Sequence, residues 1–242
     1  MNIGPSQLER VSVDGSPSEV PGFSPGRAAR AKARALRALS VTPISLPYWL
    51  IGSLLVASVA CADRGAPAAA SPAASFLTSV AAMCGQAYAG RVVANEPAAP
   101  DDPFEGKALV MHVRTCNSAE QVLVPFHVGE DRSRTWVLTL VTDRLRLKHD
   151  HRHQDGTPAT VSMYGGDSTS PGTATRQEFP VDDFSKALFT RENRAVSNTN
   201  VWAMEIEPGK MFAYELTRPG RRFRVEFDLT TPVPVPPAPW GQ

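Results

Sequence analysis

The sequence predicts a single all-β domain: an antiparallel meander of about eight or nine short strands with one or two short helices. Two observations carry this prediction. Apolar residues alternate with polar ones at the period of a strand, and short turn-forming stretches separate the alternating segments. Such a meander either closes into an up-and-down barrel or folds into a β-sandwich, and we favour the barrel. The 22 prolines are concentrated before residue 104 and after residue 231, which places the β domain at residues 76–231.

The first 60 residues predict an export signal. Residues 1–43 begin rich in Ser, Gly and Pro and end in a basic cluster, and we expect this region to be disordered. An uncharged apolar run then covers residues 44–60, and the order of basic, apolar and small residues is typical of bacterial export signals. An uncleaved membrane anchor is the alternative, but 17 residues (44 to 60) that include Pro47 are few against the ~20 needed to span a bilayer.

Cys61 directly follows the apolar run, and the sequence around it fits two alternative cleavage sites. Residues 58–61, SVAC, resemble the lipobox at which bacterial lipoproteins are cleaved before a lipid-modified cysteine, although Ser stands where Leu is usual. Residues 60–62, ACA, fit an ordinary signal peptidase, which would remove Cys61. We favour lipidation, because residues 61–75 have the Ala/Pro/Ser composition of a flexible tether. The predicted location is the cell envelope, lipid-anchored on the periplasmic side, or the secreted fraction.

The cysteine count predicts one disulfide. With Cys61 either lipidated or removed, Cys84 and Cys116 remain to pair in an oxidising compartment. The bridge would join the start of the domain to its second strand and stabilise it by roughly 3–4 kcal/mol in the loop-entropy model. Two buried free thiols are the alternative. A structural role is expected, because the sequence contains no C-x-x-C pair.

The β domain begins with a short helix predicted over residues 76–83, and a second helix is predicted over 182–192. Strands are predicted over 86–93, 107–116, 121–128, 135–142, the histidine-containing stretch that follows Asp143, 160–164, 201–206, 210–217 and 222–229. Residues 167–180 read as polar turns, and the polyproline-like tail 232–242 cannot extend the sheet. The favoured barrel resembles the calycins.

The strand after Asp143 holds three of the five histidines, and at a period of two they share a face. The candidate metal ligands are His149, His151, His153 and His127. A His-x-His pair can direct two imidazoles at one zinc ion, but a further ligand must come from another strand, either His127 or His112. We favour the simpler interpretation, in which these histidines are partly exposed and bond neighbouring carboxylates and carbonyls. No cofactor is therefore predicted, with zinc as the alternative.

Arg132, Arg134 and Trp136 form the second candidate site, where two guanidinium groups beside an indole could hold an anionic or sugar-like ligand at the barrel mouth. The simpler alternative is a loop whose Glu130 and Asp131 neutralise the arginines. The aromatic set of the last three strands is assigned to the core.

The charge balance does not favour nucleic-acid binding. Residues 63–242 contain 19 Lys+Arg (25 minus 6) and 21 Asp+Glu (24 minus 3), a formal net charge of −2. No catalytic signature is found, since Ser133 lacks a G-x-S-x-G context. An enzyme is not predicted, although a periplasmic or secreted metalloprotein stays open as the rival. The oligomeric state is not predicted.

The segments CGQAYAGRVV, PFHVGEDRSRTWVLT, LRLKHDHRHQDG, MYGGD and RRFRVEFDL resemble a family of uncharacterised exported bacterial proteins, many of them apparent lipoproteins. The resemblance implies export and a single domain, and it transfers no catalytic residue. The expected partners are a membrane, through the lipid anchor, and a small ligand or envelope component.

Overall fold

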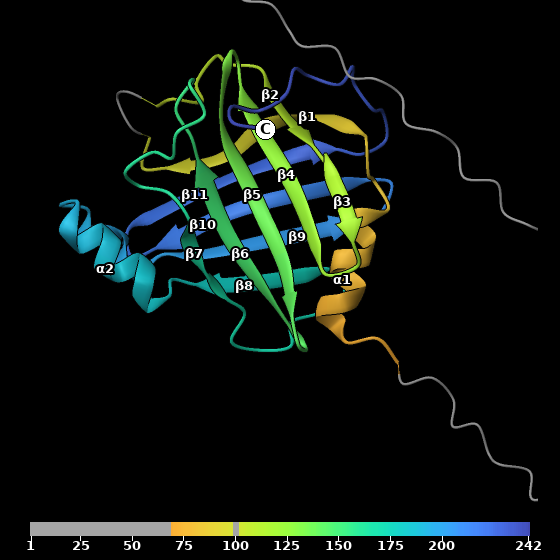
Figure 1. Cartoon of the computed structure of the whole chain (residues 1–242), viewed down its shortest axis with the longest axis horizontal. Coiled ribbons are helices and arrows are strands. Elements are labelled where there is room, and N and C mark those ends of the chain that lie inside the picture. The colour runs from red at the N-terminus through yellow and green to blue at the C-terminus, as the bar shows by residue number, and fades with distance from the viewer. Residues whose placement is uncertain (1–68, 99–101) are drawn as a thin grey trace, which may run out of the picture. The chain divides into compact units, whose positions relative to one another are not determined.

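The structure is a computed structural model that describes residues 69–98 and 102–242, and eleven strands form one antiparallel sheet within them (Figure 1). The strands are β1 (Ala87–Glu96), β2 (Leu109–His112), β3 (Thr115–Ser118), β4 (Gln121–Val128), β5 (Asp131–Val141), β6 (Arg144–His151), β7 (Tyr164–Asp167), β8 (Arg176–Pro180), β9 (Val201–Glu207), β10 (Met211–Arg218) and β11 (Arg221–Asp228). The helices are α1 (Pro72–Ala81), α2 (Asp183–Arg191) and the 3₁₀ turn η1 (Ala195–Thr199).

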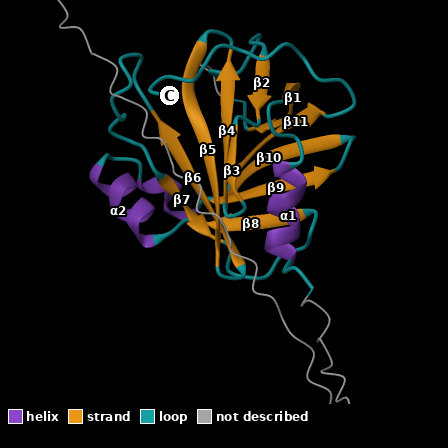
Figure 2. Cartoon of the chain, turned by 45° about the vertical axis from the view of Figure 1, so that its right-hand side comes forward, coloured by secondary structure: helices purple, strands orange, loops and turns teal. Residues whose placement is uncertain are grey.

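The strands follow the order β7-β6-β5-β4-β2-β1-β11-β10-β9-β8, with β3 paired to β4 beside this path. The sheet is strongly curved (Figure 2), and its two outermost strands, β7 and β8, come into contact with each other. The fold is therefore a nearly closed barrel, and the prediction of an all-β barrel is confirmed.

The start of helix α2, which directly follows β8, is bonded to β7 at the seam between β7 and β8. The backbone N–H of Gly165 donates to Ser185 Oγ at 2.8 Å, and the N–H of Asp182 donates to Gly165 O at 2.9 Å. A Cβ on Gly165 would lie 1.9 Å from Leu147 O, and one on Gly166 would lie 1.8 Å from Pro180 O. Glycine is therefore required at both positions of β7, because the backbones on either side leave no space for a side chain.

Alternate side chains of the strands fill the barrel. The buried core includes Met111, Val124, Leu138, Leu147, Met204, Phe212 and Phe227. The outer face of β8 to β11 instead carries a network of ion pairs. Its members are Arg176, Arg222 and Arg224 with Glu178, Glu205, Glu215 and Glu226. This division follows the alternation of the sequence, which places apolar and charged residues on opposite faces of each strand.

Helix α1 lies at one side of the barrel and α2 at the opposite side (Figures 1 and 2). Ser71 caps α1 by accepting the N–H of Ala74, and Pro72 occupies the first turn, where its missing N–H costs nothing. The helix therefore begins four residues earlier than predicted and includes the end of the segment assigned to the tether. Its apolar face, with Phe76 and Val80 fully buried, joins the core. Among the described residues, no helix has the length and apolar character needed to cross a membrane.

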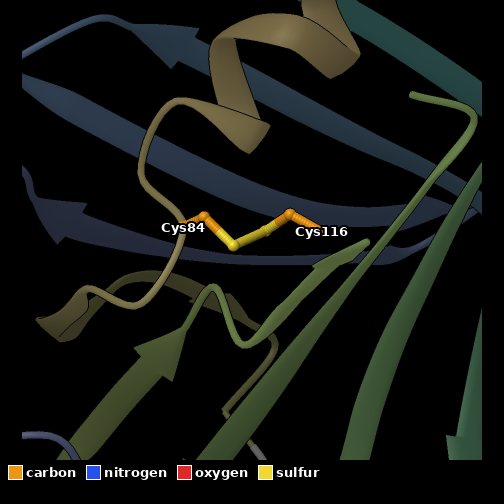
Figure 3. The surroundings of a disulfide bond; sticks show 2 residues. All are labelled: Cys84 and Cys116. Carbon is orange, nitrogen blue, oxygen red and sulfur yellow. A yellow bond between two sulfur atoms is a disulfide. The ribbon is translucent and has the colours of Figure 1, made fainter. Parts of the chain in front are cut away.

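The disulfide between Cys84 and Cys116 is present, as predicted (Figure 3). The two Cα atoms lie 6.2 Å apart across a sequence separation of 32 residues. Cys84 follows α1 and Cys116 lies in β3, so the bridge fixes the chain leaving α1 to the sheet.

The C-terminal tail is attached to the sheet rather than free of it. Val233 donates its backbone N–H to Ala87 O at 2.8 Å, and Trp240 donates its own to Arg132 O at 3.0 Å. Gly241, next to the end of the chain, lies beside Arg152 and Gly156, in the turn that follows β6. The tail thus adds a single isolated bridge to the sheet, where none was predicted, and then crosses its outer face.

Candidate functional site

Two adjoining cavities lie at the end of the barrel where α2 and η1 are found. The mouth cavity, of about 250 Å³, is lined by residues of β7, β9, β10, β11, α2 and η1 together with Phe104 and Val161. The histidine cavity, of about 70 Å³, is lined by residues of β4, β5, β6, β7 and β10 and by Phe104. Phe104, Tyr164 and Tyr214 line both, so they form the wall between the two spaces.

Larger hollows of about 520 and 450 Å³ lie elsewhere, against β1, the turn before β10 and the segment 102–107. Their charged linings are balanced. The first holds Arg91 and Lys210 with Glu226 and Asp228, and the second sets Arg91 and Lys107 against two acidic residues. We place the candidate site at the smaller mouth cavity, because its aromatic walls and uncompensated cations are suited to holding a ligand.

His149 is the centre of the histidine cavity. Its Nδ1 lies 3.1 Å from the carbonyl oxygen of Tyr164, and its Nε2 lies 2.8 Å from the hydroxyl of Tyr214. A carbonyl oxygen only accepts, so Nδ1 carries the proton and Nε2 accepts from the Tyr214 hydroxyl. The imidazole also stacks on the Tyr164 ring, with centroids 4.6 Å apart. Both ring nitrogens are therefore occupied by bonds within the barrel.

Burial keeps the histidines and tyrosines of the histidine cavity neutral. It lowers the pKa of His149 to about 3, and that of His151 to about 4. Burial raises the pKa of Tyr164 to about 12, and raises that of Tyr214 as well. Near pH 7 these four side chains offer hydrogen bonds but no charge. Tyr164 and His151 make one such bond, between the hydroxyl and Nε2 at 3.1 Å.

The predicted metal ligands are not brought together. His149 and His151 lie on β6 beside the histidine cavity, whereas His153 is exposed beyond the end of the strand. His127 is on β4, where it alternates with the core residues Phe126 and Val128 and so lies on the outer face of the sheet. Within residues 69–98 and 102–242, no group of three or more His, Cys, Asp or Glu side chains is placed to hold a metal ion.

The favoured interpretation of the histidine strand also needs correction. We expected partly exposed histidines, but His149 is only 3% exposed. It does bond a carbonyl, as expected, and its second partner is a tyrosine hydroxyl that no local pattern could reveal.

The three predicted ligand-binding residues are divided. Trp136 and Arg134 line the histidine cavity, and Arg134 pairs with Asp131 and lies over the Phe104 ring. Arg132 does not line it. The guanidinium of Arg132 reaches the carbonyl oxygen of Ala238 in the C-terminal tail.

A β-bulge causes this division. Phe126 pairs with Arg134 and Val128 pairs with Asp131, so one residue of β4 lies opposite two residues of β5. In a regular strand Arg132 would share a face with Arg134 and Trp136, and the bulge breaks this alternation.

Three arginines of the mouth cavity were not predicted as site residues. Arg194 precedes η1, while Arg218 and Arg221 flank the turn between β10 and β11. None forms an ion pair with a carboxylate of the described part of the chain, unlike the arginines on the outer face of β8 to β11. The turn sequence RPGR contains two of them, but only closure of the barrel shows that they border a cavity.

The aromatic residues assigned to the core are buried, as predicted. Trp202, Tyr214 and Phe223 have a second role, since they also form walls of the mouth cavity. Phe104 was not predicted at all. Its ring packs at a tilt against Phe223, with centroids 4.6 Å apart, and so holds the segment before β2 against β11.

Comparison with protein-family models, with curated proteins and with solved structures finds no match to this chain.

Proposed function

We propose that this protein is an exported cell-envelope binding protein, without enzymatic activity, that holds a small ligand in the mouth cavity of its barrel. One observation carries the proposal: a cavity of about 250 Å³ combines apolar walls with a few polar groups. Ligand sites of proteins have this composition, in which apolar surface supplies affinity and a small number of polar groups fixes orientation. The mouth of a β-barrel is a common place for such a site.

The arrangement of the histidine cavity supports binding over catalysis. His149 uses both ring nitrogens within the barrel, and the tyrosines beside it stay protonated near pH 7. A general base needs a free acceptor with a pKa near the working pH. His149 has neither, since burial lowers its pKa to about 3.

Export is supported by the sequence and by the disulfide. The basic and apolar segments before Cys61 have the order of a signal, and a bridge such as Cys84–Cys116 persists in oxidising compartments. Cys61 and residues 1–68 lie outside the described residues, so lipidation and the membrane partner rest on sequence alone. Labelled palmitate should attach to the wild type and not to Cys61→Ala, and the variant should leave the membrane fraction. Absence of label, with unchanged fractionation of the variant, would contradict the anchor.

Ligand binding is tested with N-phenyl-1-naphthylamine, an uncharged probe whose fluorescence rises in apolar surroundings. Wild-type protein should bind it saturably. Val161→Trp should abolish binding, because the indole fills the mouth cavity that Val161 lines. Val196→Trp is the matched control, since Val196 is 66% exposed and lies outside the lining. Absence of saturable binding to the wild type, or equal binding by both variants, would contradict the proposed site.

A further inference from the structure

We infer that the ligand of the mouth cavity is a small amphipathic anion, whose acidic head group binds Arg194, Arg218 and Arg221 and whose apolar body packs against the aromatic wall. This inference rests on the proposed function, because it names the class of ligand for the same cavity. It begins from the position of the cations. Three arginines from separate segments line one space, and no described carboxylate pairs with them.

Most arginines of the neighbouring strands have an acidic partner, although Arg91, Arg114 and Arg132, which do not line the mouth cavity, also make no ion pair with the described residues. Arg176, Arg222 and Arg224 lie on the outer face of the same strands, and each contacts one or more glutamates within 4.0 Å. Arg134 of the neighbouring cavity pairs with Asp131. The mouth arginines are thus an uncompensated group of positive charge, which suits an anionic partner brought from solution.

Neutral acceptors orient two of these arginines without neutralising them. Arg218 donates from Nη1 to Asn200 Oδ1 at 3.2 Å, and Arg221 donates from Nη1 to Pro97 O at 2.9 Å. Each guanidinium has five N–H donors, so donors remain for a ligand. Burial lowers the pKa of Arg218, and the charge of Arg221 lowers it further. An anion placed between the two side chains would relieve their repulsion.

The apolar residues that line the same cavity indicate the chemistry of the rest of the ligand. Phe189, Trp202, Leu216 and Phe223 present apolar surface within the same space as the arginines. A purely polar anion such as inorganic phosphate would leave this surface wet, whereas an apolar body would cover it. The volume of about 250 Å³ lies just below the ~300–1,000 Å³ typical of pockets for drug-sized ligands, which favours a single small body free in solution over a two-chain lipid.

Two dyes that differ by one sulfonate group test the inference. N-phenyl-1-naphthylamine is uncharged, and 8-anilinonaphthalene-1-sulfonate adds the anion to the same aromatic body. The sulfonate dye should bind wild-type protein about tenfold more tightly, since hydrogen bonds to charged groups are the stronger kind. Its affinity should also fall with added salt, while that of the uncharged dye should not.

Substitutions of the arginines should separate the two dyes. Arg194→Gln is the cleanest variant, because the Arg194 side chain makes no hydrogen bond or ion pair with the described residues, so its loss leaves no internal partner unsatisfied. Arg221→Gln is the second. Each should weaken the sulfonate dye about tenfold and leave the uncharged dye within about twofold. Arg191→Gln is the control, since Arg191 lies on α2, pairs with Glu192 and does not line the cavity.

The possible outcomes distinguish failure of the anionic-ligand inference from failure of the proposed ligand cavity. Equal affinity of the wild type for both dyes, or loss of both dyes together in the arginine variants, would overturn the anionic ligand while leaving a ligand cavity in place. If neither dye binds the wild type, both the ligand cavity and the anionic ligand are overturned.

Discussion

At the scale of single residues, burial controls the protonation of three histidines. It lowers the pKa of His149 to about 3 and lowers those of His127 and His151 to about 4, all from an ordinary value of 6.5. At pH values between these lowered pKa values and 6.5, the histidines of the unfolded chain bind more protons than those of the folded chain. The free energy of unfolding is therefore greatest above pH 6.5 and falls as the pH decreases toward 4.

His149→Gln should flatten this acid dependence, because the amide can bond both neighbours of the imidazole but does not titrate. Wild-type protein should lose about 2–3 kcal/mol of stability through His149 alone between pH 7 and pH 4.5, at ~1.4 kcal/mol per pKa unit. Urea denaturation at a series of pH values measures the slope. His153→Gln is the control for the exposed end of the same strand and should follow the wild-type profile. A variant slope equal to the wild-type slope would show that His149 is not buried as described.

Local pattern was informative for individual residues as long as the strand stayed regular. The alternation of β5 and β10 correctly turned Trp136 and Tyr214 toward the interior. It could not be applied to Arg132, because the predicted strand began at residue 135 whereas β5 begins at Asp131, and the bulge near Arg132 depends on the pairing of β4 with β5. The hydrogen bond between His149 and Tyr214 joins residues 65 positions apart, so no spacing rule could predict it.

At the scale of elements, the seam between β7 and β8 is the feature most sensitive to a small change. Gly166 lies so close to β8 that a Cβ would clash with the carbonyl oxygen of Pro180. The Pro180 oxygen belongs to the backbone and cannot rotate away as a side chain can. A side chain at position 166 would therefore push β7 and β8 apart and destabilise the closed barrel.

Gly166→Ala should destabilise the protein by about 1–3 kcal/mol, the usual range for an added methyl group in a space that is already filled. Thermal denaturation followed by circular dichroism measures the change. Gly209→Asn is a suitable control, because the surroundings of Gly209 are open and Asn tolerates its positive φ of 71°. If Gly166→Ala were as stable as the wild type, the strands would have to be farther apart at the seam than the structure shows.

Strands with clean alternation were predicted well, and strands without it were not. The prediction for β4 has the observed limits, and those for β9, β10 and β11 are within one residue at each end. The segment 107–116 proved to be two strands, and β8 was read as turns because polar residues, among them the fully buried Gln177, interrupt its apolar pattern. Gln177 is buried because its amide bonds the carbonyl oxygens of Pro171 and Thr173, which is a property of the loop that precedes it.

At the scale of the whole molecule, the C-terminal tail joins parts of the barrel that are distant in sequence. It bonds Ala87 of β1 through Val233 and reaches β5 through Trp240. His112 and His127 alternate with core residues of β2 and β4, and yet both are buried on the outer face. We attribute their burial to the tail, because Val233 bonds Ala87, which pairs with His112, and Trp240 bonds Arg132, whose charge acts on His127.

Deletion of residues 232–242 should therefore lower the free energy of unfolding by about 2–4 kcal/mol, from lost backbone hydrogen bonds and lost apolar burial. Urea denaturation checks this at pH 7. Val235→Ser is the control, because Val235 is 56% exposed and its replacement should change stability by less than about 0.5 kcal/mol. An unaltered midpoint after the deletion would mean that the tail does not stabilise the barrel.

The fold class could be predicted from the sequence because alternation and turns are local properties. The mouth cavity could not, because its walls come from six elements between β7 and β11 and from the segment before β2. Which charged side chains share that space depends on closure of the sheet. A cation is recognised as lacking an acidic partner only when all its neighbours are known.

The pairing of β1 with β11 has a consequence for how the chain reaches its fold. Gly90 lies opposite Phe227 in this pair, so the first strand finds one of its two neighbours only when the last strand has been made. During synthesis from the N-terminus, one edge of β1 stays unpaired while more than half of the chain follows it. Contacts of such long sequence separation slow folding. The completed barrel therefore cannot form from its N-terminal half alone, because the pairing that closes β1 needs the final strand.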